Sequence, residues 1–181
     1  MIVASAGLDG SWVLEPELIR DNRGFFARAW DAAALPPEVA LLSWPQTNLS
    51  GNDRRGTVRG LHWQVDPYGE AKLLRCTAGA VFDVAVDLRP GSPTFGRWQG
   101  VRLSAELRNA VLIPAGCAHG YQALEDGAEV LYQVSHPYVP GSECGARWDD
   151  PAIGIEWPIT EDVIVSAKDS AWPDIRLEEI R

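Results

Sequence analysis

Two of the three histidines in this chain stand in β-like segments flanked by glycine. His62 lies in the run 59–64 (RGLHWQ), and His119 lies in the run 114–120 (PAGCAHG). Imidazole has the unperturbed pKa nearest to neutrality of all side chains, so such a pair suggests proton transfer or metal binding. If both segments are strands facing one barrel interior, the two rings share an active site. For each histidine alone, a structural place in the core is an equally ordinary role.

Removal of a proton from a carbon next to a ketone needs a base, a cation for the developing enolate oxygen and an acid that returns a proton. His62 is the candidate base, Lys72 the candidate cation and Tyr132 the candidate acid. A carboxylate bonded to the far ring nitrogen of His62 would raise its basicity and fix its tautomer. Asp83 and Asp169 both qualify as that carboxylate, and sequence spacing does not choose between them. Each of these residues also has an ordinary structural role open to it.

The overall charge restricts the ligands that the chain can bind. A formal net charge of -9 and a pI near 4.8 repel polyanions, which argues against nucleic acid and anionic membranes as partners. An anionic ligand therefore needs a local basic cluster. Arg23, Arg59 and Lys72 lie beside glycine or in a strand-like run, where they could bind phosphate oxygens, and Gln46 and Asn48 add neutral donors.

The hydrophobic pattern is typical of strands rather than helices. The run 72–89 forms two β segments around Ala78-Gly79, which predicts a hairpin. Turn signals separate further predicted strands at 98–103, 110–113, 120–124 and 129–134. One short helix is expected within 31–42, and a tail after 141, with a last turn at 175–180, is expected to pack on the strands. The pattern indicates an all-β sandwich or barrel.

Length and cysteine content predict a single cytoplasmic domain over 1–181. The 181 residues include 46% apolar side chains, enough for one core, and no linker-like stretch divides them. Three widely spaced cysteines and the lack of a signal-peptide pattern are typical of a reduced, cytoplasmic protein. No apolar run approaches the roughly 18 residues that span a bilayer.

Several segments together carry a specific pattern. The most specific are the histidine motif 56–64 (GTVRGLHWQ) and the long run 81–98 (VFDVAVDLRPGSPTFGRW), whereas an isolated Arg-Gly or His-Gly pair would mean little. They are accompanied by matching segments at 21–26, 46–50, 70–73, 113–120, 131–132 and 147–158. Nearly from end to end, the chain resembles the dTDP-4-dehydrorhamnose 3,5-epimerases, the nucleotide-sugar epimerase branch of the cupins.

This resemblance implies a fold and an activity. The fold would be an all-β, cupin-type jelly-roll barrel with short flanking helices, assembled as a homodimer. The activity would be inversion of C3, C5 or both in a dTDP-4-keto-6-deoxyhexose through an enolate, without metal or other cofactor. Such a reaction serves the biosynthesis of dTDP-L-rhamnose or a related deoxysugar.

The resemblance also implies roles for residues at matching positions. His62 would be the base with Asp169 as its partner, and Tyr132 would be the acid on the opposite face. Lys72 and Arg59 would hold the ketone oxygen and the adjacent sugar and phosphate. The remaining expected site residues are His119 and Asp83 as supporting pocket residues, Arg23, Gln46, Asn48 and Tyr138 as nucleotide-diphosphate ligands, and Phe26 reaching in from the partner subunit.

Two positions depart from the family pattern. Arg28 replaces a glutamate that helps to contact the nucleobase, and Trp63 replaces the more usual Tyr or Phe after the histidine. Neither change removes a residue expected to transfer a proton.

Three alternatives remain open from the sequence. A single-site C3- or C5-epimerase of a secondary-metabolite pathway would share these motifs. A metal-dependent cupin would use His62 and His119, although no second histidine follows His62 at two residues. A catalytically silent module would bind the sugar nucleotide without exchanging its protons.

Overall fold

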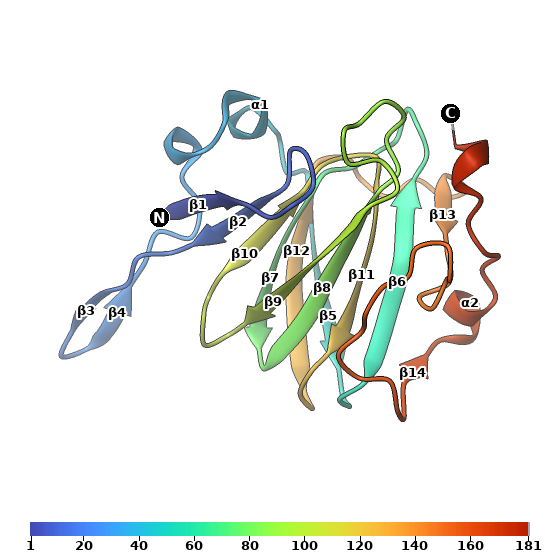
Figure 1. Ribbon diagram of the computed structural model, residues 1–181. Helices are drawn as coiled ribbons and strands as arrows, with labels where there is room; N and C mark the ends of the chain where they lie inside the picture. The colour runs from blue at the N-terminus through green and yellow to red at the C-terminus, as the bar shows by residue number, and fades with distance from the viewer. Residues whose placement is uncertain (181) are drawn as a thin grey trace.

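The computed structural model describes residues 1–180 and consists of two β-sheets packed face to face (Figure 1). The first sheet has the order β1-β2-β10-β7-β12-β5, with strands Ile2–Ser5, Trp12–Glu15, Ala110–Ile113, Lys72–Ala78, Ala128–Val134 and Gln46–Asn52. The second has the order β13-β6-β11-β8-β9, with strands Glu143–Gly145, Thr57–Gln64, Cys117–Ala123, Ala80–Asp87 and Trp98–Ser104. The all-β prediction is confirmed, although the two sheets do not close into one hydrogen-bonded barrel.

Small elements flank the two sheets. The pair β3 (Ile19–Asp21) and β4 (Gly24–Phe26) forms a separate hairpin that projects from the body, and β14 (Ile164–Val165) pairs in parallel with β6 (Figure 1). The region 31–42 holds a 3-10 turn (Ala32–Ala34) and α1 (Pro37–Ala40) rather than one helix, because the proline pair interrupts it. The tail contains α2 (Ala167–Ser170) and the expected last turn, at Leu177–Glu179.

The main core fills the space between the sheets. Leu74 and Val111 from the first sheet pack with Val81, Ala85 and Leu103 from the second, and each of these five residues is fully buried. Burial of each large aliphatic side chain contributes about 1.5–3 kcal/mol relative to exposure. This shared core fixes the separation of the two sheets and therefore of the side chains that face one another across them.

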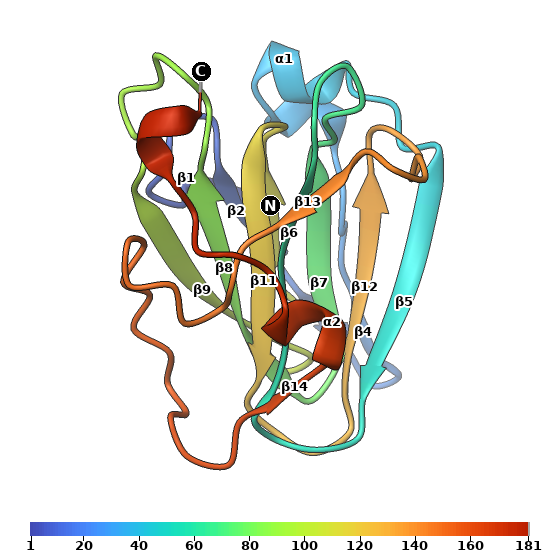
Figure 2. The same ribbon diagram turned by 90° about the vertical axis from the view of Figure 1, so that its right-hand side faces the viewer.

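The outer faces are also covered, which explains why the central strands carry almost continuous apolar runs. Val84 and Val86 of β8 pack outward against Trp157 and other residues of the tail, which crosses the second sheet in Figure 2. Leu14 and Leu112 of the first sheet pack against the helical region before β5. Strands buried on both faces lose the alternation that a half-exposed strand shows.

The predicted hairpin at Ala78-Gly79 is wrong, although both of its strands exist. β7 pairs with β10 and β12, whereas β8 pairs with β9 and β11 in the other sheet. Gly79, at φ +63°, forms the corner at which the chain crosses between sheets. Both strands lie inside their sheets with neighbours on each side, so neither has an edge free for the other.

The described residues hold their cysteines as free thiols, with Cys76 and Cys117 buried in the main core. Among residues 1–180, no helix is both long and apolar enough to cross a membrane.

Candidate active site

The two predicted histidines are direct neighbours on adjacent strands. His62 of β6 and His119 of β11 are register partners, so their side chains emerge on the same face of the sheet. Two glycines allow the strands to approach here: a Cβ on Gly60 would lie 2.6 Å from Gly120 Cα, and one on Gly120 would lie 2.7 Å from the Arg59 carbonyl oxygen. The expectation that both histidines lie on strands facing one interior is confirmed.

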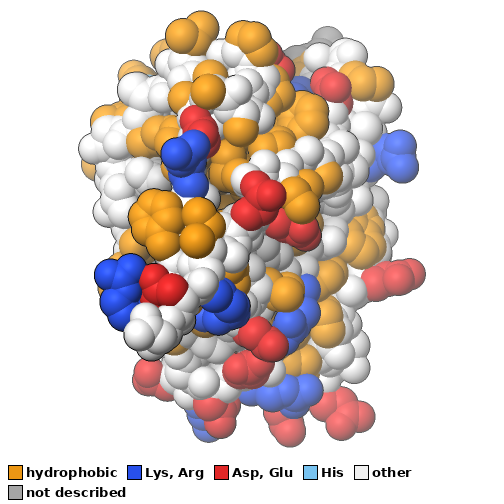
Figure 3. Space-filling view, turned by 90° about the vertical axis from the view of Figure 1, so that its left-hand side faces the viewer, with side chains coloured by type: hydrophobic (Ala, Val, Ile, Leu, Met, Phe, Trp, Pro, Cys, Tyr) orange, Lys and Arg blue, Asp and Glu red, His pale blue; other side chains and the backbone are white. Residues whose placement is uncertain are grey.

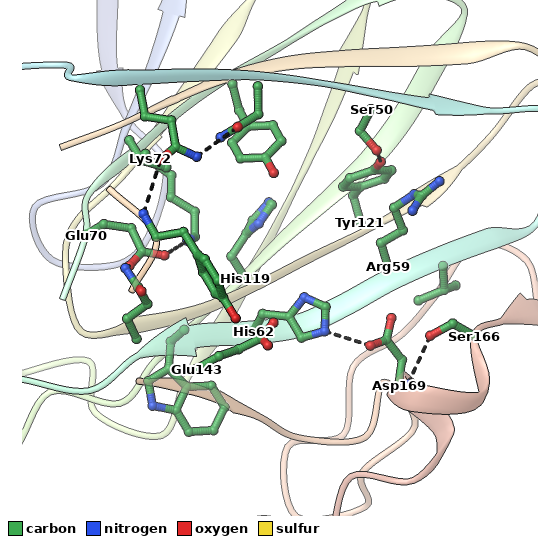
Figure 4. Close-up of a pocket in the computed structure, with 18 of the residues that line it drawn as sticks. Ser50, Arg59, His62, Glu70, Lys72, His119, Tyr121, Glu143, Ser166 and Asp169 are labelled. Carbon is green, nitrogen blue, oxygen red and sulfur yellow. Dashed lines mark hydrogen bonds and ion pairs between the residues drawn. The ribbon is translucent and has the colours of Figure 1, made fainter. Parts of the chain in front are cut away.

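Each histidine is hydrogen-bonded to its own buried aspartate. His62 Nε2 lies 2.7 Å from Asp169 Oδ1, and His119 Nε2 lies 2.8 Å from Asp83 Oδ2. The choice that spacing left open is thus settled by geometry, with Asp169 as the partner of His62 (Figure 4). Burial raises the pKa of the Asp83 carboxyl, and the charges of His119 and Lys72 oppose that rise.

The short helix α2 presents Asp169 to the barrel. Ser166 caps this helix by accepting a hydrogen bond from the Asp169 backbone N–H at 3.0 Å. The second carboxylate oxygen of Asp169 accepts a longer bond from the Gly60 backbone N–H, at 3.4 Å. A carboxylate at this position holds the His62 ring in one orientation.

Both sheets line a cavity of about 670 Å3. Nine of the twelve expected site residues contribute to its wall: Gln46, Asn48, Arg59, His62, Lys72, His119, Tyr132, Tyr138 and Asp169. His62 and Tyr132 enter it from different sheets, through β6 and β12. An imidazole and a phenol therefore line the cavity from two different sheets.

Lys72 is a buried cation at the start of β7. Its ammonium group forms an ion pair with Glu70, and both side chains are buried (Figure 4). Gln64 donates a hydrogen bond to the other carboxylate oxygen of Glu70 at 2.6 Å and accepts one from the Val139 backbone N–H at 2.7 Å. This network ties the cation to the loop that follows β12.

Tyr132 is suited to donate a proton. Burial raises the pKa of its phenol, the neighbouring Tyr121 adds to the rise, and the Arg59 charge opposes it. The phenol is therefore protonated at neutral pH.

Cationic and neutral donors line another part of the cavity. Arg59 donates from Nε to Asn52 Oδ1 and from its terminal nitrogen to the Gly51 carbonyl oxygen, each at 2.9 Å. Gln46 donates to Asn48 Oδ1 at 2.9 Å and accepts from the Tyr138 backbone N–H at 3.2 Å. Tyr138 is 54% exposed, which leaves its ring free to cover a ligand.

The other three expected residues do not line this cavity. Asp83 lies behind His119, to which it is bonded. Arg23 and Phe26 belong to the projecting hairpin, where Arg23 pairs with Asp21 and Phe26 is 65% exposed. Arg28 follows this hairpin and pairs with Asp31.

Sequence reasoning gave no role to several residues at the site. Glu70 and Gln64 lay inside matched segments, but only the fold shows that they meet Lys72. Glu143, which also lines the cavity, pairs with Lys168 from α2. A usable signal was the spacing of Glu70 and Lys72, because a carboxylate two residues before a lysine in an apolar run suggests an ion pair.

The chemistry available is abstraction and return of a proton beside a carbonyl group. The residue types needed for it line one cavity: an imidazole bonded to a carboxylate at His62, an ammonium group at Lys72 and a phenol at Tyr132. Within residues 1–180, no group of three or more His, Cys, Asp or Glu side chains is arranged to hold a metal ion.

Known proteins match this chain over most of its length. The family model described as dTDP-4-dehydrorhamnose 3,5-epimerase matches residues 5–176. A curated relative of that name from Sinorhizobium fredii is 42% identical over 163 residues, covering 90% of this chain and 84% of its own length.

Two solved structures share the fold. An epimerase from Legionella pneumophila in complex with dTDP-4-keto-L-rhamnose superimposes with a TM-score of 0.87 at 38% identity, covering 99% of this chain and 94% of its own. A 3'-monoepimerase from Streptomyces bikiniensis in complex with dTDP-quinovose gives 0.84 at 34% identity, covering 96% and 87%. These matches confirm the predicted cupin-type jelly-roll fold. The chain belongs to the dTDP-4-dehydrorhamnose 3,5-epimerase family.

Proposed function

We propose that this protein is a cofactor-independent epimerase that inverts C5 and C3 of a dTDP-linked 4-keto-6-deoxyhexose. The observation that carries the proposal is the placement of the His62–Asp169 pair and Tyr132 on different sheets around one cavity, with Lys72 in its wall. The Legionella relative, bound to a dTDP-4-keto sugar, supports this substrate class.

The reaction follows from these positions. His62 removes the proton from the carbon next to the ketone, and the C–H electron pair moves into the enolate while Lys72 stabilises its oxygen. Tyr132 then donates its proton to the same carbon from the other face, which inverts the configuration. Return of the proton from His62 to the Tyr132 phenolate, through solvent, restores both groups for the second carbon.

The nucleotide would be held by the remaining donors. Arg59 would contact the sugar and phosphate, and Gln46, Asn48 and Tyr138, which also line the cavity, would contribute further polar contacts. Arg23 and Phe26 lie on the hairpin, so we assign their contacts to the site of a partner subunit. The whole chain then acts as one cupin-like domain in a cytoplasmic homodimer.

Isotope exchange tests this function. With a dTDP-4-keto-6-deoxyhexose in deuterated water, NMR should show deuterium entering at C5 and at C3. The same incubation with His62→Asn is the control. Absence of exchange at both carbons with the unmodified protein would reject the proposal.

A single inversion is the second candidate, because a similar structure is that of a 3'-monoepimerase. The same spectra decide this point. Label confined to C3 or to C5 identifies a single-site enzyme, whereas sequential label at both identifies the double inversion.

A further inference from the structure

The helix that carries Asp169 cannot hold its own position. α2 spans four residues, and a helix of one turn is unstable in isolation, so contacts with the rest of the protein must place it. The Ser166 cap acts within the same segment and orders the turn without fixing it to the sheet. The pairing of β14 with β6 and the Lys168–Glu143 ion pair hold the start of α2 against the second sheet. A further contact after α2 would fix its other end and with it the distance from Asp169 to His62.

Trp172, which follows α2 and lies three residues after Asp169, makes such a contact. Its indole lies directly on the backbone of Gly145, where an added Cβ would stand 2.3 Å from Trp172 Cε2 and 2.4 Å from Nε1. Gly145 is the β13 register partner of His62. The tryptophan thus packs on the strand pair that carries the catalytic histidine.

The indole also lies near the side chains of His62 and Lys168. The Trp172 and His62 ring centroids are 6.5 Å apart with an edge-on angle of 65°, and Lys168 Nζ lies 5.9 Å from the Trp172 ring. Among the described residues, Trp172 Nε1 is buried without a hydrogen-bond partner. A buried donor without a partner is unfavourable, so packing rather than hydrogen bonding holds the ring here.

We propose that Trp172 is a positioning residue. Its indole packs between α2 and the paired residues His62 and Gly145, and so holds the Asp169 carboxylate within hydrogen-bond distance of the His62 ring. The inference deepens the proposed epimerase function and rests on His62 as its base. Glycine at position 145 is needed for this packing, because any larger residue there would displace the indole.

A spectroscopic signature tests this placement without any turnover. An imidazole N–H bonded to a carboxylate has a downfield proton resonance, which Asp169→Asn and His62→Asn should remove and thereby assign. Trp172→Ala should weaken or remove this resonance, and Trp172→Phe, which keeps an aromatic ring, should restore most of it. Gly145→Ala should resemble Trp172→Ala although the indole is still present.

Kinetics with a dTDP-4-keto sugar provide the second measurement. For Trp172→Ala and Gly145→Ala, kcat for deuterium exchange should fall roughly 10- to 100-fold with little change in KM, since misplacement of a catalytic group by about 1 Å can cost 10²-fold. Trp44→Ala is the matched control, because Trp44 also has a buried, unpartnered Nε1 but packs outside the other sheet. It should leave the resonance and kcat unchanged.

The outcomes separate this inference from the proposed function. An unaltered resonance in folded Trp172→Ala or Gly145→Ala protein overturns the positioning role. Losses of the resonance and of kcat in Trp44→Ala equal to those in Trp172→Ala overturn it as well. If Trp172→Ala does not fold, Gly145→Ala and Trp172→Phe decide the question. If the unmodified protein exchanges no deuterium, the epimerase proposal fails while the resonance still reports on Trp172.

Discussion

Two histidine–aspartate pairs lie side by side, and the two differ in how exposed their side chains are. The His62 side chain is 32% exposed, compared with 11% for His119, and Asp83 behind His119 is almost fully buried. Both rings line the cavity, so the greater exposure of His62 favours it as the base, and the deeper burial of His119 and Asp83 favours a supporting role for that pair.

Replacement of each histidine by asparagine should separate these roles. His62→Asn should lower exchange by about 10²–10⁴-fold, the usual contribution of a general base, with little loss of stability. His119→Asn should lower the free energy of unfolding by about 1–3 kcal/mol, because it leaves the buried Asp83 without its partner. Denaturant titrations and deuterium-exchange rates of the two variants check both expectations. A large loss of activity in His119→Asn with a loss of stability in His62→Asn would reverse the roles assigned to the two histidines.

Glu70 should matter to the reaction through Lys72. In Glu70→Gln the ion pair is lost and the ammonium group is free to leave the position from which it would face the enolate oxygen. We expect kcat to fall roughly 10-fold or more, as for a displaced catalytic group. Initial rates compared with those of Glu106→Gln, an exposed control, measure the effect, and equal rates would show that Lys72 needs no anchor.

Much of the site could be predicted from residue types within short motifs, whereas the pairing of His62 with Asp169 was predicted only through the family resemblance and not from sequence spacing. His62 and Lys72 lie ten residues apart on matched segments, whereas Asp169 stands 107 residues after His62. Only the path of the tail across the second sheet brings Asp169, rather than Asp83, to the His62 ring. For the same reason, nothing in the sequence marked Trp172.

Strand positions were predictable where apolar runs end at turn residues. The strands at 98–104, 110–113 and 128–134 match the expected segments closely. The sheet to which each of β7 and β8 belongs was not predictable, because a corner at Gly79 that leads into another sheet has the same local sequence signals as a hairpin turn. Sheet membership depends on contacts with distant strands.

The connection between β8 and β9 is held by one buried carboxylate. Asp87 accepts hydrogen bonds from Arg89 Nε at 2.9 Å, Ser92 Oγ at 2.5 Å and Thr94 Oγ1 at 2.6 Å. Burial alone would raise the pKa of Asp87, but these hydrogen bonds outweigh it and hold that pKa well below its usual value.

This linkage predicts acid sensitivity. A carboxyl whose pKa is lower in the folded than in the unfolded state stabilises the fold above its unfolded pKa of about 3.9, and this contribution is lost as pH falls further. Asp87→Asn should therefore lower the free energy of unfolding by about 2 kcal/mol or more at pH 7, and the difference should narrow below pH 4. Denaturant titrations at several pH values, with exposed Asp53→Asn as control, measure this. A difference independent of pH would contradict it.

The projecting hairpin gives one side of the molecule a distinct surface. Ile19, Phe25 and Phe26 are all exposed there, and the view from this side shows hydrophobic side chains interspersed with basic and acidic ones (Figure 3). Arg108 lies 4.2 Å from the centre of the Phe25 ring and supports the hairpin. Such a projection suits contact with a second subunit, in line with the proposed homodimer.

Mixing two defective subunits tests that assembly. If Phe26 completes the partner's site, Phe26→Ala should raise KM for the dTDP-sugar, whereas His62→Asn should lower exchange by about 10²–10⁴-fold. Mixed dimers then contain one site with an intact His62 and an intact Phe26, so a refolded mixture should exceed the summed activity of the two variants at limiting substrate. Simple additivity would show that Phe26 does not act across subunits.

The buried thiol of Cys117 can report how often the hydrophobic core opens to solvent. Burial in the core raises the pKa of its thiol to about 12, with the nearby Arg89 charge opposing the rise. At pH 8 only about one molecule in 10⁴ would carry the reactive thiolate, since each pKa unit is a tenfold change in ionisation. Alkylation of Cys117 therefore requires transient exposure of the core, and the alkylation rate measures how often the core opens to solvent.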